Sequence, residues 1–233
     1  MIKDNVVIFG YPRSGTKLLA NVLEQQEYFN FGEFFETFST EFKNDSHVAT
    51  RLSREDQFAI FRSVNSNMYE EVHKHSILLS ERIKSFQNIN VPNKTTLTIF
   101  GDTVDIYPEL LDILGSRYFL CTRRKNILEQ LLSKLLTYYY KNYNGEEPSK
   151  QMIINLDQMN RFFFNLKKTE RIQDYLVSTG RGIIIDFDQL ITGTLDLGFK
   201  YKVTSIDQHE NIENFIINYD EVIEKFNYLN SLY

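Results

Sequence analysis

Short apolar segments alternate along this chain with longer segments whose apolar residues recur every three or four positions. The short segments are typical of buried β-strands, and they cover residues 6–10, 28–31, 96–101, 117–122 and 182–186. The longer segments are typical of helices, and they cover residues 16–26, 108–114, 126–140 and 151–178. Strands that alternate with helices in this order predict a three-layer α/β/α fold with a central parallel sheet of about five strands.

A long stretch of helical pattern breaks this alternation after the second strand. Its longest candidate helix covers residues 56–86, where no glycine or proline interrupts the chain. We therefore expect a helical insertion at approximately residues 37–95, within a single domain that spans residues 1–233. A chain of 233 residues is long enough to bury the core of one such domain.

The composition is that of an ordinary globular protein, with 42% hydrophobic and 24% charged residues. A net charge of −5 argues against a broad basic surface, so we expect neither nucleic acid nor an anionic membrane as a partner. The single cysteine, Cys121, excludes a disulfide within the chain and suits a reducing compartment. The apolar run near the N-terminus is too short for a signal peptide or a membrane span. Together these features predict a cytoplasmic protein.

The turn between the first strand and the first helix has the composition of an anion-binding loop. Residues 10–17 read Gly-Tyr-Pro-Arg-Ser-Gly-Thr-Lys, with two glycines, two hydroxyl residues and two cations. A strand that leads into a helix through such a turn directs unpaired backbone N–H groups, at the positive end of the helix dipole, toward one point. Gly10 and Gly15 permit the tight turn and the close approach of a phosphate. The loop therefore predicts a phosphate site, because a plain capped turn does not need this many of each residue type.

The nearest alternative for this loop is the nucleoside-triphosphate P-loop, Gly-x-x-x-x-Gly-Lys-Ser/Thr. Gly10 and Gly15 have its spacing, but Thr16-Lys17 reverses the order of the lysine and the hydroxyl residue. In the P-loop the lysine reaches the β- and γ-phosphates and the hydroxyl binds magnesium, so the reversal displaces both groups by one residue. This order counts against an ATPase or kinase, for which Asp102 would supply the acidic residue at a nearby strand end.

The same loop resembles the 5′-phosphosulfate loop of the sulfotransferases that use 3′-phosphoadenosine 5′-phosphosulfate (PAPS). That loop usually reads Pro-Lys/Arg-Ser-Gly-Thr-Thr followed by an apolar pair, and here residues 12–19 read Pro-Arg-Ser-Gly-Thr-Lys-Leu-Leu, with Lys17 in place of the second threonine. The resemblance implies a P-loop-NTPase-like fold and a catalytic role for Arg13, whose charge would stabilise the bridging oxygen and the departing phosphate. It assigns contacts with the 5′-phosphosulfate of the donor to Arg13, Ser14, Gly15, Thr16, Lys17 and Leu18.

A second basic cluster lies at the end of the fourth apolar segment. Arg123 and Arg124 follow a buried strand, at the edge where open α/β sheets bind ligands, and Ser133 follows on the next helix. The sulfotransferase family has a matching pattern, in which an arginine at a strand end and a serine on the following helix hold the 3′-phosphate of the donor. Here Ser133 is nine residues from Arg124 and ten from Arg123. The resemblance leaves both arginines as candidates, and we favour Arg124.

Transfer of a sulfuryl group to a hydroxyl needs a base near the acceptor oxygen and positive charge around the leaving phosphate. In some bacterial-type family members an acidic segment after the second strand carries this base, and residues 31–36 (Phe-Gly-Glu-Phe-Phe-Glu) resemble it. Glu33 and Glu36 are the candidates, with Glu33 slightly preferred, because they can share a helix face and apolar rings around a carboxylate raise its pKa. The alternative explanation is a helix start whose acidic residues complement the dipole.

No metal site is expected from this sequence. His73 and His75 are two residues apart, so on a helix they point in different directions, and no group of carboxylates has ligand spacing. The resemblance to the PAPS-dependent sulfotransferases implies an enzyme that moves a sulfuryl group from PAPS to a hydroxyl or amine of a small-molecule or carbohydrate acceptor, with no metal required. The alternatives are a P-loop small-molecule kinase or NTPase and a nucleotide-binding relative without catalysis.

Overall fold

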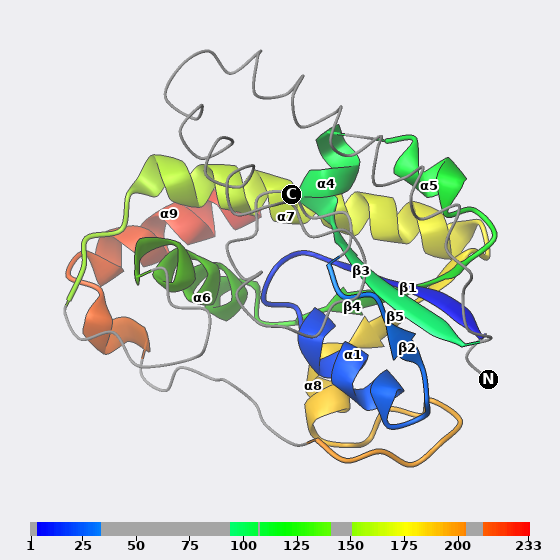
Figure 1. Cartoon of the computed structure of the whole chain (residues 1–233). Helices are drawn as coiled ribbons and strands as arrows, with labels where there is room; N and C mark the ends of the chain where they lie inside the picture. The colour runs from blue at the N-terminus through cyan, green and yellow to red at the C-terminus, as the bar shows by residue number, and fades with distance from the viewer. Residues whose placement is uncertain (1–3, 34–93, 107, 141–150, 204–211) are drawn as a thin grey trace, which may run out of the picture.

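The computed structural model describes residues 4–33, 94–106, 108–140, 151–203 and 212–233 (Figure 1). The expected helical insertion, with its candidate helix at residues 56–86, lies almost entirely outside the described residues.

Five strands form one sheet in which neighbouring strands run parallel. In chain order they are β1 (Asn5–Gly10), β2 (Phe29–Asn30), β3 (Thr95–Phe100), β4 (Tyr118–Arg123) and β5 (Gly182–Asp186). Their order across the sheet is β2-β3-β1-β4-β5, so β1 lies in the centre between β3 and β4. The prediction of a parallel sheet of five strands is confirmed, and the apolar segments locate each strand end to within one residue.

Helices cover both faces of this sheet (Figure 1). On one face lie α1 (Thr16–Glu24) and α8 (Phe187–Ile191), and on the other lie α4 (Gly101–Ile106), α5 (Leu110–Ile113) and α7 (Leu156–Ser178). The division follows the alternation of side chains along β1. Val6 and Ile8 share a core with α1 and α8, whereas Val7 and Phe9 share a core with α4, α5 and α7.

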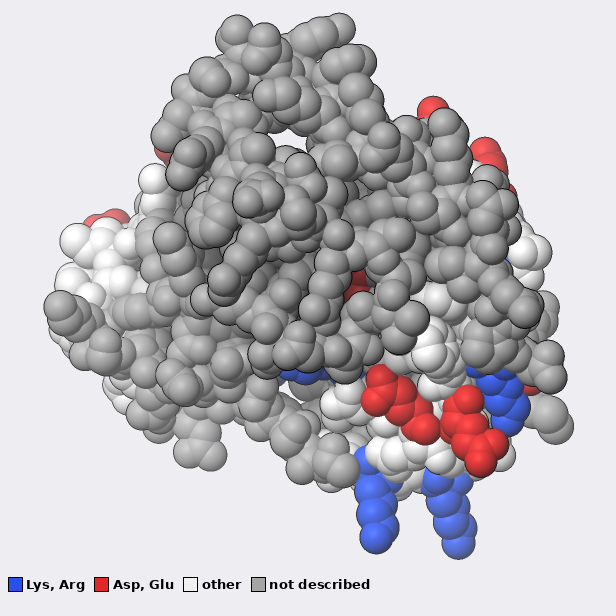
Figure 2. Space-filling view, in the orientation of Figure 1, with Lys and Arg blue, Asp and Glu red and all other residues white. Residues whose placement is uncertain are grey.

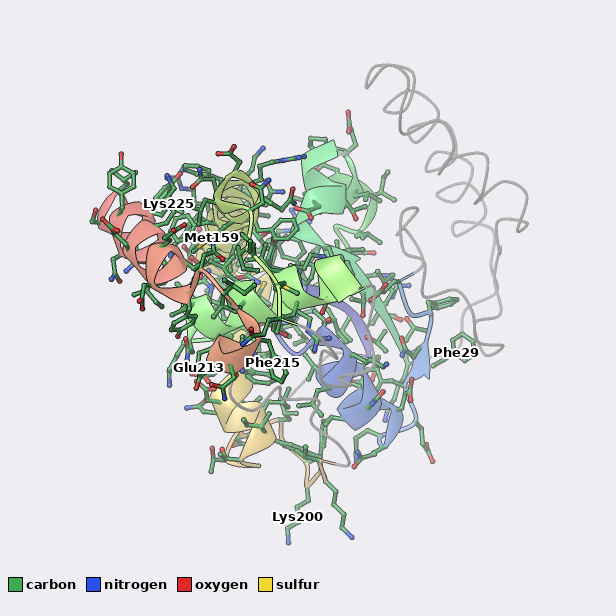
Figure 3. The ribbon with its side chains drawn as sticks, turned by 90° about the vertical axis from the view of Figure 1, so that its left-hand side faces the viewer. Phe29, Met159, Lys200, Glu213, Phe215 and Lys225 are labelled. Atoms are coloured by element: carbon green, nitrogen blue, oxygen red, sulfur yellow. The ribbon has the colours of Figure 1, made fainter. Side chains whose placement is uncertain are left out.

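A further group of helices packs against the first half of α7. It consists of α6 (Ile127–Tyr140), the 3₁₀ helix η1 (Ile212–Phe215) and α9 (Tyr219–Ser231). Met159 of α7 and Phe215 of η1 belong to its apolar cluster (Figure 3), together with Leu135 of α6 and Val222 of α9. The sequence gives only a mixed pattern beyond residue 186, so neither α8 nor α9 is among the predicted helices.

The helix predicted at residues 151–178 begins later than expected, at Leu156. Asn155 is its N-cap, and the Asn155 side chain accepts hydrogen bonds from the backbone N–H groups of Asp157 and Gln158. The segment before this cap is extended, and Met152 forms an isolated parallel bridge with Ile216.

The end of β4 decides which basic side chains reach each face of the sheet. Successive side chains of a strand point to opposite faces. Phe119 and Cys121 lie in the core with α7, and Leu120 lies in the core with α1 and α8. Arg123 and Arg124 continue this alternation, so they leave the strand toward different helices.

Candidate anion-binding site

The loop of residues 11–15 joins β1 to the N-terminus of α1. Arg13 (φ 69°) and Gly15 (φ 91°) have left-handed backbone conformations, which turn the chain sharply before the helix. Gly15 is the N-cap of α1, and no side chain in the described part of the chain forms a capping hydrogen bond there. The N–H groups of the first helical turn lie at the positive end of the helix dipole, so this loop has the local chemistry of an anion site.

Both glycines of the loop are also required by packing. A Cβ atom on Gly10 would lie 2.3 Å from Thr122 Oγ1 and 2.5 Å from Ser14 Oγ. A Cβ atom on Gly15 would lie 2.4 Å from Cδ2 of Phe187, the first residue of α8. A side chain at either position would therefore displace the loop from β4 or from α8.

The side chains of the loop divide into buried and exposed groups. Ser14 is only 1% exposed, and its Oγ is 2.7 Å from Oγ1 of Thr122 in a hydrogen bond that ties the loop to β4. Thr16 and Leu18 are buried and Lys17 is exposed. Ser14 is expected to contribute a hydroxyl donor to the phosphate, whereas the structure places this hydroxyl against Thr122, and the Ser14 backbone N–H donates to the carbonyl oxygen of Tyr11 at 3.2 Å.

A second set of hydrogen bonds ties the loop to α6. Arg13 Nε donates a hydrogen bond to Ser133 Oγ, with 2.9 Å between the two atoms. Gln130, about one turn earlier on α6, donates from Nε2 to the carbonyl oxygen of Pro12 at 3.1 Å. Arg13 and Ser133, which the family resemblance assigns to different parts of the donor, therefore lie in direct contact.

Arg123 is bound to α7. Its Nε donates to Oε1 of Gln173 at 2.8 Å, and its Nη2 donates to the carbonyl oxygen of Glu170 and to the carboxylate of Asp174, each at 2.8 Å. Three acceptors on one helix use most of the donor capacity of this guanidinium. Arg123 thus serves the packing of α7 on the sheet.

Arg124 lies on the other face, at the start of α8. Its guanidinium carbon is 4.7 Å from the centroid of the Phe187 ring, a cation–π contact, and its Nη2 forms an ion pair with Glu129 of α6. The side chain is buried, yet its Nε has no hydrogen-bond partner among the described residues. Of the two adjacent arginines, Arg124 has more donor capacity left over.

Of the two carboxylates predicted as a base, the structure describes only Glu33, and Glu36 lies outside the described residues. Glu33 follows Gly32, whose carbonyl oxygen accepts a hydrogen bond from the backbone N–H of Thr98 in β3. This register places Glu33 near the carboxyl end of β3, the same edge of the sheet that carries the loop after β1. Glu33 is half-buried there.

Two buried polar residues near the loop escaped the sequence interpretation. Gln173 of α7 is 1% exposed, and its Nε2 donates to the carbonyl oxygens of Phe9 at 3.1 Å and Thr122 at 3.0 Å, which holds the ends of β1 and β4 together. Tyr11 lines a small pocket with Gln173. Burial, and then the nearby carboxylate of Asp102, raise the pKa of Tyr11 well above its ordinary value, so the phenol is neutral.

The described residues show mixed charge and no metal centre. On the face seen in Figure 2, acidic and basic side chains lie close together over the lower part of the molecule, where Lys200 projects outward (Figure 3). Within the described ranges no group of three or more His, Cys, Asp or Glu side chains could hold a metal ion. None of the described helices combines the length and the apolar character that crossing a membrane requires.

A scan against protein-family models gives no match for this chain, and a search of curated proteins finds no relative. Neither comparison assigns a family to this chain.

Proposed function

We propose that this protein is a sulfotransferase, which transfers a sulfuryl group from PAPS to a hydroxyl or amine of a small-molecule or carbohydrate acceptor. The observation that carries the proposal is the 2.9 Å hydrogen bond between Arg13 and Ser133, which are 120 positions apart in the chain. The family resemblance assigns Arg13 to the 5′-phosphosulfate and Ser133 to the 3′-phosphate. Because one nucleotide carries both groups, the residues that bind them must lie close together, as these two do.

The chemistry of the site fits a donor with two anionic groups. The uncapped N-terminus of α1 offers backbone N–H groups to one of them. The Arg124 guanidinium, with Nε unpartnered among the described residues, offers charge and a donor to the other. A buried donor without an acceptor costs free energy, and a bound phosphate oxygen would remove that cost. This fit supports a P-loop-like binding mode for PAPS.

PAPS would supply the sulfuryl group, and the residues of this chain would bind it, orient it and neutralise its charge. The N–H groups of residues 15–18 would hold the 5′-phosphosulfate with Lys17 nearby, while Arg124 and Ser133 would hold the 3′-phosphate. Arg13 would neutralise the charge that develops on the phosphate oxygen as its bond to sulfur breaks. Glu33 or Glu36 would accept the proton of the acceptor as the new bond to sulfur forms, which leaves 3′-phosphoadenosine 5′-phosphate as the second product.

A thermal-shift titration with the product nucleotide tests the donor assignment. A ligand that binds only the folded state raises the melting temperature. We expect 3′-phosphoadenosine 5′-phosphate to raise it without magnesium, and more than ATP does at equal concentration. If only ATP with magnesium raises the melting temperature, and 3′-phosphoadenosine 5′-phosphate does not, the result contradicts the proposal.

The matched variants Glu33→Gln and Glu36→Gln test the base. We expect one of them to lower the turnover of sulfuryl transfer at least about a hundredfold, because general-base catalysis contributes this much, while binding of the product nucleotide persists. If both variants keep full turnover, neither carboxylate is the base.

A magnesium-dependent kinase or NTPase is the second candidate, because a carboxylate lies where such an enzyme needs one. Asp102 follows β3, the neighbour of β1, and its charge contributes to the raised pKa of Tyr11, the first residue of the loop. Carboxylates of this kind hold Mg²⁺ in phosphoryl-transfer sites. The kinase hypothesis predicts that magnesium increases stabilisation by ATP and that Asp102→Asn abolishes this increase, whereas the sulfotransferase hypothesis predicts that magnesium adds nothing in the wild-type protein.

A further inference from the structure

One aromatic side chain contacts both parts of the candidate anion site, the loop at the N-terminus of α1 and the side chain of Arg124. Phe187 is buried at the start of α8. Its ring edge lies against the loop, since a Cβ atom on Gly15 would come within 2.4 Å of Cδ2 and 3.0 Å of Cε2. Its ring face carries the guanidinium of Arg124, whose Cζ is 4.7 Å from the ring centroid. The ring is therefore the shared contact of the α1 N-terminus and Arg124.

The contacts of Arg124 fix its guanidinium without using all of its donors. A guanidinium prefers to stack on an aromatic face, so the Phe187 ring restricts the plane of the group. Glu129 holds Nη2 from the side of α6, and Nε has no partner among the described residues. The position of the guanidinium is thus determined by the ring and by one carboxylate, while part of its capacity to bind an anion remains.

The Phe187 ring is itself held in place by the start of α8. Asp186 caps this helix by accepting hydrogen bonds from the backbone N–H groups of Asp188 at 2.9 Å and Gln189 at 3.2 Å. The other carboxylate oxygen of Asp186 forms an ion pair with Lys125 at 2.9 Å, next to Arg124 in the chain. The turn that carries the ring is therefore tied both to α8 and to the segment after β4.

We propose that Phe187 is a positioning residue that sets the distance between the loop and Arg124, and so makes the site selective for nucleotides with phosphates at both the 3′ and 5′ positions. This inference rests on the proposed function. A ligand with only a 5′-phosphate uses the N–H groups of the loop and gains nothing from Arg124. A 3′,5′-bisphosphate gains the second contact only if the guanidinium lies at the matching distance, and the ring determines that distance.

Calorimetric titration of the full chain with 3′-phosphoadenosine 5′-phosphate and with adenosine 5′-monophosphate measures this selectivity as a ratio of dissociation constants. We expect the wild-type protein to prefer the bisphosphate at least about tenfold, the worth of one charge-assisted contact. Phe187→Leu and Arg124→Lys should each remove most of this preference, with little change for the monophosphate. The double variant should lose no more than the stronger single variant, because coupled residues are not additive.

Leu190 of α8 provides the matched control, since it is fully buried in the same core cluster. Leu190→Ala should lower the melting temperature and keep the selectivity, and Leu190→Val serves the same purpose if the alanine variant does not fold. Phe187→Tyr keeps the ring and should keep the selectivity. Equal binding of both nucleotides by the wild-type protein would overturn the proposed donor. If the wild-type protein is selective and the Phe187→Leu variant stays selective, the role of Phe187 is wrong while the proposed donor stands. The same holds if the losses of the two single variants add in the double variant.

Discussion

The two sides of the sheet at the end of β4 carry adjacent arginines with different environments. On the α7 side, Arg123 donates to three acceptors and belongs to the packing of the helix. On the α8 side, Arg124 stacks on Phe187, pairs with Glu129 and keeps an unpartnered Nε among the described residues. Residue type alone therefore does not say how much of its donor capacity an arginine retains in the folded protein. The number of acceptors that the fold already provides separates a structural guanidinium from one that can bind a ligand.

We expect the largest effect, a loss of stability, from substitution of Gln173, whose hydrogen bonds connect α7 with β1 and β4. Gln173→Leu leaves the carbonyl oxygens of Phe9 and Thr122 and the Nε of Arg123 without their partner. We expect the free energy of unfolding to fall by about 3 kcal/mol, because each buried group that loses its hydrogen bond is costly. Urea denaturation measures this change.

Gln173→Glu is the control for that variant. Its carboxylate retains an acceptor for Arg123 but faces the two carbonyl oxygens without an N–H donor, so a loss of stability as large as that of Gln173→Leu would assign the effect to the two carbonyl groups rather than to Arg123. A Gln173→Leu protein as stable as the wild type would show that the α7 side does not depend on this network.

The matched pair Arg123→Lys and Arg124→Lys tests the comparison directly. We expect Arg124→Lys to weaken binding of 3′-phosphoadenosine 5′-phosphate by about tenfold or more, because lysine offers a point charge in place of a stacked, planar donor. Arg123→Lys should lower stability by about 1 kcal/mol and leave the affinity unchanged. Calorimetric titration and urea denaturation of both proteins give the two measurements, and a reversal of the two effects would exchange the roles of the arginines.

A smaller effect is expected at Glu129, which occupies part of the Arg124 guanidinium. Glu129→Gln removes a negative charge next to the site, so affinity for 3′-phosphoadenosine 5′-phosphate should rise about two- to fivefold at low salt. Because Glu129 is one-third exposed, salt should screen this gain. Asp112→Asn on α5 makes the same change in net charge near the opposite end of the sheet, and an equal gain there would mean that only net charge matters.

The smallest effect is expected at Cys121, on the α7 side of β4. Burial raises the pKa of the Cys121 thiol to about 12, so almost no reactive thiolate exists at pH 8 in the folded protein. The thiol should react with a disulfide reagent such as DTNB only after unfolding, when its pKa returns to the ordinary range. Rapid reaction of the folded protein at pH 8 would show that β4 is more open on this side than the structure has it.

The sequence was sufficient for the sheet and for the loop after β1. Continuous apolar runs indicate buried parallel strands, and Gly10 and Gly15 indicate the turn. Both the strands and the turn can be predicted because each depends on residues that are neighbours in the sequence. Helices α8 and α9 were missed, since α8 has only five residues and α9 follows a segment without clear spacing. The available signal for α9 is the pair Val222 and Leu229, which lie two helical turns apart.

The division of roles between Arg123 and Arg124 depended on contacts that sequence reasoning could not see. Strand alternation predicts that the two side chains leave on opposite faces, but it does not say which of them binds a phosphate, so the preference for Arg124 stays a prediction. Which face carries free donor capacity depends on Gln173 and Phe187, from segments about 50 or more residues away. The buried polar positions Thr169 and Gln173 in the apolar stripe of α7 were the available signal.

The contacts of the loop also have a consequence for how the chain acquires its site. Ser14 meets Thr122 across 108 positions and Arg13 meets Ser133 across 120, so the ends of the site join only when long stretches of chain have been closed. Contacts of this range form late in folding, after local helices, because closing long loops costs entropy. A nascent chain that has exposed only β1 and α1 therefore has the loop without its supports. Ligand binding would begin only after β4, α6 and α8 have docked against the loop, so a bound nucleotide would report, and stabilise, the assembled site.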